Sequence, residues 1–163
     1  MTAILGIDPG AAGGWVILGG EGGLVDLGRM DKLDEREHAD LVAGWTVTFP
    51  SLFAYVERAQ AFPRMGVAGA FNYGKGYGMW LGMLAAAGIG YETVPAAAWQ
   101  KALGLSGAGG GRAKNPSGHK RALVEEARRR WPELPKHSGV CDASLIAEYG
   151  RRMRNGAEQR RAG

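Results

Sequence analysis

Three carboxylates in this sequence, those of Asp8, Glu57 and Asp142, could carry out one chemical task together. Carboxylates are hard oxygen ligands of the kind that Mg²⁺ prefers. A cluster of them can hold two Mg²⁺ ions roughly 3.5–4 Å apart, and such a pair stabilises both the attacking water and the leaving oxygen when a phosphate ester is cleaved. The three residues therefore predict a phosphodiester nuclease that uses Mg²⁺, or Mn²⁺ in its place, provided that the fold brings them to one point.

The local sequence places each carboxylate where a different structural element begins or ends. Asp8 follows the apolar, β-prone residues 3–7 and precedes a Pro-Gly turn signal, so it should lie where a first strand enters a hairpin. Glu57 ends another β-prone run, where a carboxylate is desolvated unless a cation compensates. Asp142 opens a stretch whose apolar residues have helical spacing, at positions 141, 145, 146 and 149. Each residue alone also has an ordinary explanation, for example Asp8 as a turn residue.

These elements belong to a regular α/β pattern. β-prone runs predict five strands, at about 3–8, 13–19, 23–29, 52–57 and 90–94. Helical periodicity predicts helices at about 34–45, 71–87, 96–103, 117–131 and 139–153, the first begun by Asp34. Consecutive strands followed by alternating strands and helices predict a five-stranded mixed sheet with helices on both faces. One domain should cover residues 1–150, and the basic residues 151–163 should form a disordered C-terminal tail.

Composition narrows the class of protein. At 163 residues, of which 45% are hydrophobic, the chain is long enough for one domain with a substantial core. No apolar run approaches the roughly 20 residues of a membrane span, and the N-terminus lacks the pattern of a signal segment. We therefore expect a soluble cytoplasmic protein, in the bacterial host cell if it is phage-encoded, with an organelle left open. The single cysteine, Cys141, excludes an intrachain disulfide framework. It is expected in the core, as are four tryptophans, Trp15, Trp45, Trp99 and Trp131.

Charge is distributed unevenly along the chain. Residues 1–57 contain 3 Lys/Arg against 9 Asp/Glu, whereas residues 58–163 contain 17 against 7, so the net charge changes from −6 to +10. A basic surplus of this size suits a phosphate backbone. Part of it could be no more than a solvated surface, because five arginines belong to the last thirteen residues. Residues 58–150 alone still contain 12 basic against 6 acidic residues, so the prediction of a nucleic-acid partner does not depend on the tail.

The order of the motifs resembles the RuvC-type Holliday junction resolvases, within the RNase H-like nuclease group. The resemblance runs from Ile4 to about Tyr149 and rests on IDPGAAGGWVI, YVERAQAFP, FNYGKGYGM, VPAAAWQKALGL, GHKRALVEEARRRWPEL and DASLIAEYG. In pattern the chain is similar to the short phage-type and organellar members. The resemblance implies an RNase H-like fold, a homodimer, branched DNA as partner, and no nucleotide cofactor. It also implies paired incisions in four-way junctions that leave 5′-phosphate and 3′-hydroxyl ends.

Two glycine-rich loops are expected to meet the DNA. The first, residues 61–78, offers basic and aromatic side chains that suit a phosphate backbone and an unpaired base, namely Arg64, Phe71, Tyr73 and Lys75. The resemblance implies a junction-probing aromatic residue in this region, which we assign to Phe71. The alternative is that Phe71 and Tyr73 simply cover the core.

The second loop, residues 104–118, cannot bury an apolar face and is expected to be mobile without DNA. Four residues lie between it and the next helix, where they could hold a DNA strand: Arg112, Lys114, His119 and Lys120. The resemblance favours Lys120, because the family places a basic residue near the scissile phosphate at this helix start. Arg112 and Lys114 could equally belong to a solvated linker, and His119 could be a helix cap.

The fourth group of the site departs from the family pattern. Relatives of this type usually carry a second acidic residue, or in some a histidine, one turn before the residue that matches Asp142. Here that turn reads Lys136-His137-Ser138-Gly139. Ser138 falls on the helical face of Asp142, but a hydroxyl is a poorer Mg²⁺ ligand than a carboxylate and suits a helix N-cap. His137 could act as the general base for the attacking water, or merely precede the helix.

Other functions are left open by the sequence. Residues 69–76 match the phosphate-binding pattern GxxxxGK, although Gly76 stands where a Ser or Thr would follow. The DPGAAGG segment could be the phosphate turn of an actin-like ATPase or sugar kinase, but the chain is too short for two lobes. A branched-DNA-binding protein that has lost cleavage would explain Ser138. Candidates for a dimer surface are Met79, Trp80, Met83 and Leu84, which suit the core at least as well.

Overall fold

The computed structural model describes residues 3–60 and 65–162. Its strands form one five-stranded sheet in the order β3-β2-β1-β4-β5. Their bounds are β1 Ile4–Asp8, β2 Gly14–Leu18, β3 Leu24–Arg29, β4 Phe53–Glu57 and β5 Gly90–Val94. The first three strands pair antiparallel, whereas β1, β4 and β5 are parallel to one another. The predicted mixed sheet is confirmed.

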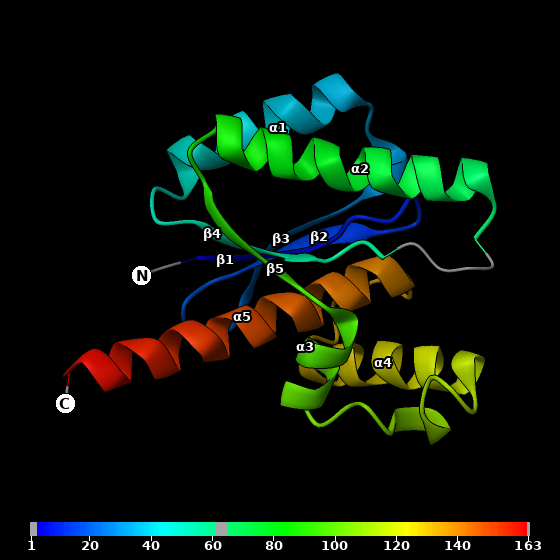
Figure 1. Cartoon of the computed structure of the whole chain (residues 1–163). Coiled ribbons are helices and arrows are strands. Elements are labelled where there is room, and N and C mark those ends of the chain that lie inside the picture. The colour runs from blue at the N-terminus through cyan, green and yellow to red at the C-terminus, as the bar shows by residue number, and fades with distance from the viewer. Residues whose placement is uncertain (1–2, 61–64, 163) are drawn as a thin grey trace.

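Helices cover both faces of this sheet, as the sequence predicts. They are α1 Glu35–Thr48, α2 Val67–Ala86, α3 Ala96–Ala102, α4 Pro116–Arg130 and α5 Ser138–Ala162, with short 3₁₀ turns η1 Met30–Lys32 and η2 Ala108–Gly110. Figure 1 shows α1 and α2 on one face, and α5 on the other with α3 and α4 beside it. An apolar cluster fills each layer between sheet and helices. None of the described helices is both long and apolar enough to cross a membrane.

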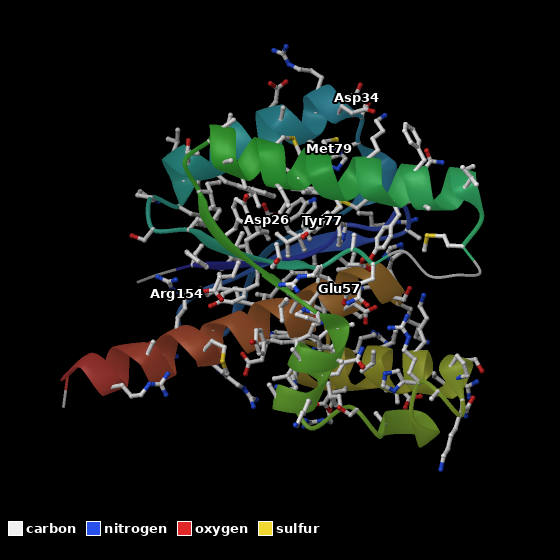
Figure 2. The ribbon with its side chains drawn as sticks, viewed as in Figure 1. Asp26, Asp34, Glu57, Tyr77, Met79 and Arg154 are labelled. Carbon is white, nitrogen blue, oxygen red and sulfur yellow. The ribbon has the colours of Figure 1, made fainter. Side chains whose placement is uncertain are left out.

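The helix α1 begins at the residue that the sequence predicts. The Asp34 side chain accepts a hydrogen bond from the Glu37 backbone N–H at 2.8 Å, and the Glu37 carboxylate accepts one from the Asp34 N–H at 2.8 Å. This reciprocal capping box satisfies two N–H groups that would otherwise lack partners at the helix start. Asp34, at the start of α1, is labelled in Figure 2.

The helix α2 begins earlier than predicted and absorbs most of the first expected loop. Residues from Val67 onward are helical, so the glycines of this segment lie within a helix. At one of them the fold explains the residue type: a Cβ on Gly76 would lie 3.0 Å from the Pro9 carbonyl oxygen, so glycine lets the helix pass close to the turn after β1. The GxxxxGK segment therefore forms helix rather than a phosphate-binding loop, because its interior N–H groups bond within the helix.

The helix α5 extends through the predicted disordered tail. It continues to Ala162, and three arginines of this segment have contacts along the helix or on the sheet. Arg151 and Arg152 donate to the Glu148 carboxylate, each at 2.7 Å. The Arg154 guanidinium lies 4.0 Å from the ring centre of Phe53, and Figure 2 shows its side chain directed from α5 toward the sheet. The expectation of a disordered tail is thus replaced by ordered helix.

The expected core residues are buried. Trp15, Trp45, Trp99 and Trp131 are all less than 7% exposed, and Cys141 is fully buried. Trp80 and Leu84 belong to the core cluster beneath α2, so they cannot form the dimer surface for which the sequence made them candidates.

Candidate active site

Asp8 and Glu57 are brought together by the parallel pairing of β1 and β4. Ile7 lies opposite Val56 in this pair, so the next residue of each strand emerges at the same edge of the sheet. Both carboxylates are half-buried. Figure 2 shows Glu57 on the side of the sheet where α5 and α3 lie. The register therefore places Asp8 and Glu57 at neighbouring strand ends.

Asp142 reaches the same edge because α5 packs directly on β1. A Cβ on Gly6 would collide with the Ala143 carbonyl oxygen, so only glycine allows this approach. Gly139, in the first turn of α5, forms an isolated parallel bridge with Gly13, which lies just before β2. Asp142 follows Gly139 by three residues, nearly one helical turn, and it lines a cleft of about 260 Å³ together with Glu57.

Burial raises the pKa of all three carboxylates, and like charge adds to the shift at two of them. Burial, and then the charge of Asp8, raise the pKa of Glu57 to about 7. Burial, followed by the charges of Asp8 and Glu57, raises the pKa of Asp142 to about 8. Burial also raises the pKa of Asp8, although the Gly10 N–H that bonds its carboxylate opposes the shift. Like charges that interact through a low-dielectric interior disfavour ionisation, and a cation would relieve all three at once.

One carboxylate oxygen of this cluster lacks a partner that a cation could provide. Asp142 Oδ1 is buried and has no hydrogen-bond partner in the structure. A buried carboxylate oxygen without a donor is costly, and a divalent ion supplies the positive charge that it lacks. Within the described residues, however, no three Asp, Glu, His or Cys side chains are close enough to hold an ion as they stand. The carboxylates are near neighbours, and their side chains are not gathered into a closed ligand set.

A buried tryptophan that the sequence assigned only to packing contacts this cluster. The Trp99 Nε1–H donates to Glu57 Oε2 at 2.9 Å. The signal available in the sequence was general, since a buried indole N–H commonly has a hydrogen-bond acceptor, but nothing in the spacing identified Glu57 as that acceptor.

Two of the predicted basic residues lie beside the carboxylates. Arg112 and Lys120 are exposed, line the cleft with Glu57 and Asp142, and both lower the pKa of Asp142. Lys114 is exposed but does not line this cleft. His119, in contrast, is 3% exposed, with Nδ1 2.9 Å from the Ala108 carbonyl oxygen and Nε2 3.2 Å from Gln100 Oε1. Its ring therefore ties the second loop to α3 and α4 rather than lying on the surface for DNA.

The residues predicted in the first loop have different surroundings. Phe71 is 71% exposed on α2, so it does not cover the core. Tyr73 is half-buried and faces the carboxylates: burial, with the charges of Glu57 and Asp8, raises its pKa to about 12. Lys75 pairs with Glu35 of α1 at 2.6 Å. Arg64 lies outside the described residues.

His137, rather than Ser138, caps the start of α5. The His137 Nδ1 accepts a 3.3 Å hydrogen bond from the Val140 N–H, so the histidine caps α5 while Ser138 is its first residue. Burial, followed by the charge of Arg29, lowers the pKa of His137, which favours the neutral ring. With Nδ1 as acceptor, the ring proton resides on Nε2, which makes this face of the ring a donor rather than a base.

Comparison with known proteins gives a fold for this arrangement. No protein-family model and no curated protein matches the chain. Among solved structures, Thermus thermophilus RuvC in complex with a Holliday junction substrate has a TM-score of 0.64 at 20% identity, over 95% of this chain and 97% of that one. A second Thermus thermophilus RuvC structure has a TM-score of 0.60 at 18% identity, over 94% and 97%. The chain has the fold of RuvC across nearly its whole length.

Proposed function

We propose that this protein is a divalent-cation-dependent endonuclease that resolves four-way DNA junctions. The observation that carries the proposal is the cluster of Asp8, Glu57 and Asp142, half-buried at one edge of the sheet, with raised pKa values and with one carboxylate oxygen unpartnered. Basic residues line the adjoining cleft. The same fold occurs in a protein solved on a Holliday junction, which supports branched DNA as the substrate.

The donor set suits Mg²⁺, with Mn²⁺ as a substitute, because it consists of hard carboxylate oxygens. The charge of Asp8 acts on both Glu57 and Asp142, so Asp8 would be the ligand shared by two ions. Glu57 and Asp142 would complete the two coordination shells. Bound there, the ions would polarise the scissile phosphate and lower the pKa of the attacking water.

The remaining residues of the site have roles that follow from their charges. Lys120, beside Asp8 and Asp142, would hold a phosphate oxygen against the carboxylate edge. Neutral His137 would donate from Nε2 to a phosphate oxygen, since its Nδ1 is occupied by the Val140 N–H. Cleavage in line with the water would give a 5′-phosphate and a 3′-hydroxyl. Exposed Phe71 on α2 would contact unpaired bases at the junction.

A symmetric junction requires two cuts, and one copy of the proposed site would make one of them. We therefore propose that the protein acts as a homodimer with twofold symmetry, which places two sites on opposite strands. Dimers in which one subunit carries Asp8→Asn would nick a single strand. Light scattering of the intact protein should then give a mass of about twice 17.3 kDa.

The test is to map cuts on both strands of a mobile four-way junction by denaturing gel electrophoresis, with Mg²⁺ or Mn²⁺. The parent should make symmetric, opposed nicks, and Asp8→Asn should bind the junction with unchanged affinity but leave it intact. Removing Asp8 removes metal ligation without altering the basic cleft. Equal cleavage by parent and variant would exclude Asp8 from the site and, with it, the proposed mechanism.

A second function is favoured by the absence of an acidic residue at Ser138 and by the open arrangement of the three carboxylates. A junction-binding protein that does not cut would share the fold and the basic cleft. The same assay separates the two functions, because binding without any nick in Mg²⁺ or Mn²⁺ would establish the non-cleaving one.

A further inference from the structure

The contact between Glu57 and Trp99 follows from how β5 leads into α3. Val94, the last residue of β5, lies opposite Glu57 across the parallel pair β4–β5. Pro95 then caps the start of α3, so this helix begins beside the end of β4. The turn carries Trp99 to Glu57, where its Nε1–H donates to Oε2 at 2.9 Å.

The Trp99 indole is held in place by packing, whereas the Glu57 side chain can rotate. Trp99 is 1% exposed and packs in the core cluster beneath α5, so its ring cannot turn without disrupting that packing. Glu57 lies half-buried at a strand end, and its side chain has several rotatable bonds. An indole has one donor and no acceptor, so it can engage one carboxylate oxygen and leaves Oε1 for another ligand. The tryptophan therefore sets the orientation of the glutamate.

The hydrogen bond is not explained by a general need to satisfy buried tryptophans. The indole N–H groups of Trp15 and Trp45 are buried in this structure without any partner. Trp80 donates to a sulfur atom, Met30 Sδ, and Trp131 donates to a backbone oxygen, Gly22 O. Among the described tryptophans, Trp99 alone donates to a carboxylate, and that carboxylate belongs to the site.

The helix that carries Trp99 also has a side-chain contact with α4. Gln100, the next residue, lies with Oε1 3.2 Å from Nε2 of His119, which precedes Lys120 at the start of α4. Both Gln100 and His119 are buried. Displacement of α3 would therefore disturb the glutamate and the basic cleft together.

From this geometry we propose that Trp99 is a positioning residue, which aims the Glu57 carboxylate at a divalent cation. The inference rests on the proposed function, in which Glu57 is a metal ligand. Residues that orient a metal ligand through a hydrogen bond typically contribute 10- to 100-fold to metal affinity. Loss of the indole N–H should therefore weaken cation binding while leaving the DNA contacts intact.

The experiment compares Trp99→Phe with Trp131→Phe. Trp131 is a matched control, because it is 6% exposed and its N–H makes a hydrogen bond of the same length, 2.9 Å, to Gly22 in the turn between β2 and β3. That turn adjoins Leu18, which pairs with Ile4 at the end of β1 opposite to Asp8. Mn²⁺ binding to each intact protein is measured by calorimetry, and junction affinity is measured in EDTA.

Trp99→Phe should bind Mn²⁺ about tenfold or more weakly than the parent, with unchanged junction affinity, whereas Trp131→Phe should bind Mn²⁺ as the parent does. At saturating Mn²⁺ the cleavage rate of Trp99→Phe should recover most of its loss. Equal Mn²⁺ affinity for Trp99→Phe and the parent would overturn the inference and leave the nuclease proposal standing. A parent that neither binds Mn²⁺ nor cuts junctions would overturn both.

A second measurement covers the case in which Trp99→Phe does not fold. In the ¹H–¹⁵N spectrum of the parent, the assigned Trp99 indole resonance should move on addition of Mg²⁺ and in the Glu57→Gln variant, while the Trp131 resonance stays in place. A Trp99 resonance that responds to neither change would overturn the positioning role.

Discussion

At the scale of single residues, Asp142 is a carboxylate in an unfavourable environment. It is the helix-borne member of the cluster, its Oδ1 lacks a partner, and two other acidic groups act on it. Without a cation the folded protein is most stable when this group is protonated. Because the pKa rises from 3.8 in an unfolded chain to about 8 in the fold, the folded state binds the extra proton between these values. Stability is therefore lost as pH rises through this window.

The stability of the parent protein should therefore depend on pH in a way that the variant Asp142→Asn does not. In EDTA, the parent should lose stability relative to Asp142→Asn as pH rises from about 4 to 8, by an amount on the order of 2–5 kcal/mol. Mg²⁺ should restore much of the loss at pH 8 in the parent and little in the variant. Urea unfolding of both proteins at four pH values measures the difference. Parallel stability curves for parent and variant would show that Asp142 is not a strained acid.

At the scale of elements, the site depends on how closely α5 lies on β1. A Cβ on Gly6 would overlap backbone atoms of Ala143 and Ala147, which cannot move without shifting the helix that carries Asp142. Gly6→Ala should therefore destabilise the protein by about 1–3 kcal/mol or more, and should also weaken Mn²⁺ binding. Urea unfolding and calorimetry provide the two measurements.

The control for this substitution is Gly44→Ala in α1. A Cβ there meets no atom within 4 Å, so the substitution should stabilise the protein by about 0.5–1 kcal/mol through helix propensity alone. If Gly6→Ala were tolerated as well as Gly44→Ala, the close packing of α5 on β1 would not be what places Asp142.

Sequence patterns predict the five strands and single out the three carboxylates as candidates, because both depend on local periodicity and on strand ends. Every strand lies within about one residue of its predicted bounds. Contacts between residues far apart in the chain cannot be predicted from such patterns. Local patterns do not predict the start of α2, because glycines favour loops, or the length of α5, because a run of arginines is typical of a solvated segment. The Trp99–Glu57 bond spans 42 positions, and the His137 cap depends on where α5 begins.

At the scale of the whole molecule, the basic surplus after residue 57 should make junction binding strongly dependent on salt. Lys120 is exposed at the cleft beside Asp8 and Asp142. Lys120→Ala should weaken binding similarly for all junction sequences and reduce the slope of log K against log salt by about 1.

Arg36→Ala provides the comparison for Lys120→Ala. Arg36 is paired with Asp40 on α1, which covers the opposite face of the sheet from α4. Its removal should leave the salt slope unchanged. Fluorescence anisotropy with labelled junctions between 50 and 200 mM salt, roughly the range in which counterion release dominates, measures both variants. Equal slopes for Lys120→Ala and the parent would remove Lys120 from the DNA interface.

The most direct measurement of the whole account is the position of the cation itself. Crystals grown with a four-way junction and Mn²⁺, with anomalous diffraction recorded at the manganese edge, should show manganese contacted by oxygens of Asp8, Glu57 and Asp142, after side-chain movements that close the cluster. Manganese bound elsewhere, or none beside these residues at millimolar Mn²⁺, would contradict the claim that the three carboxylates form a metal-dependent active site.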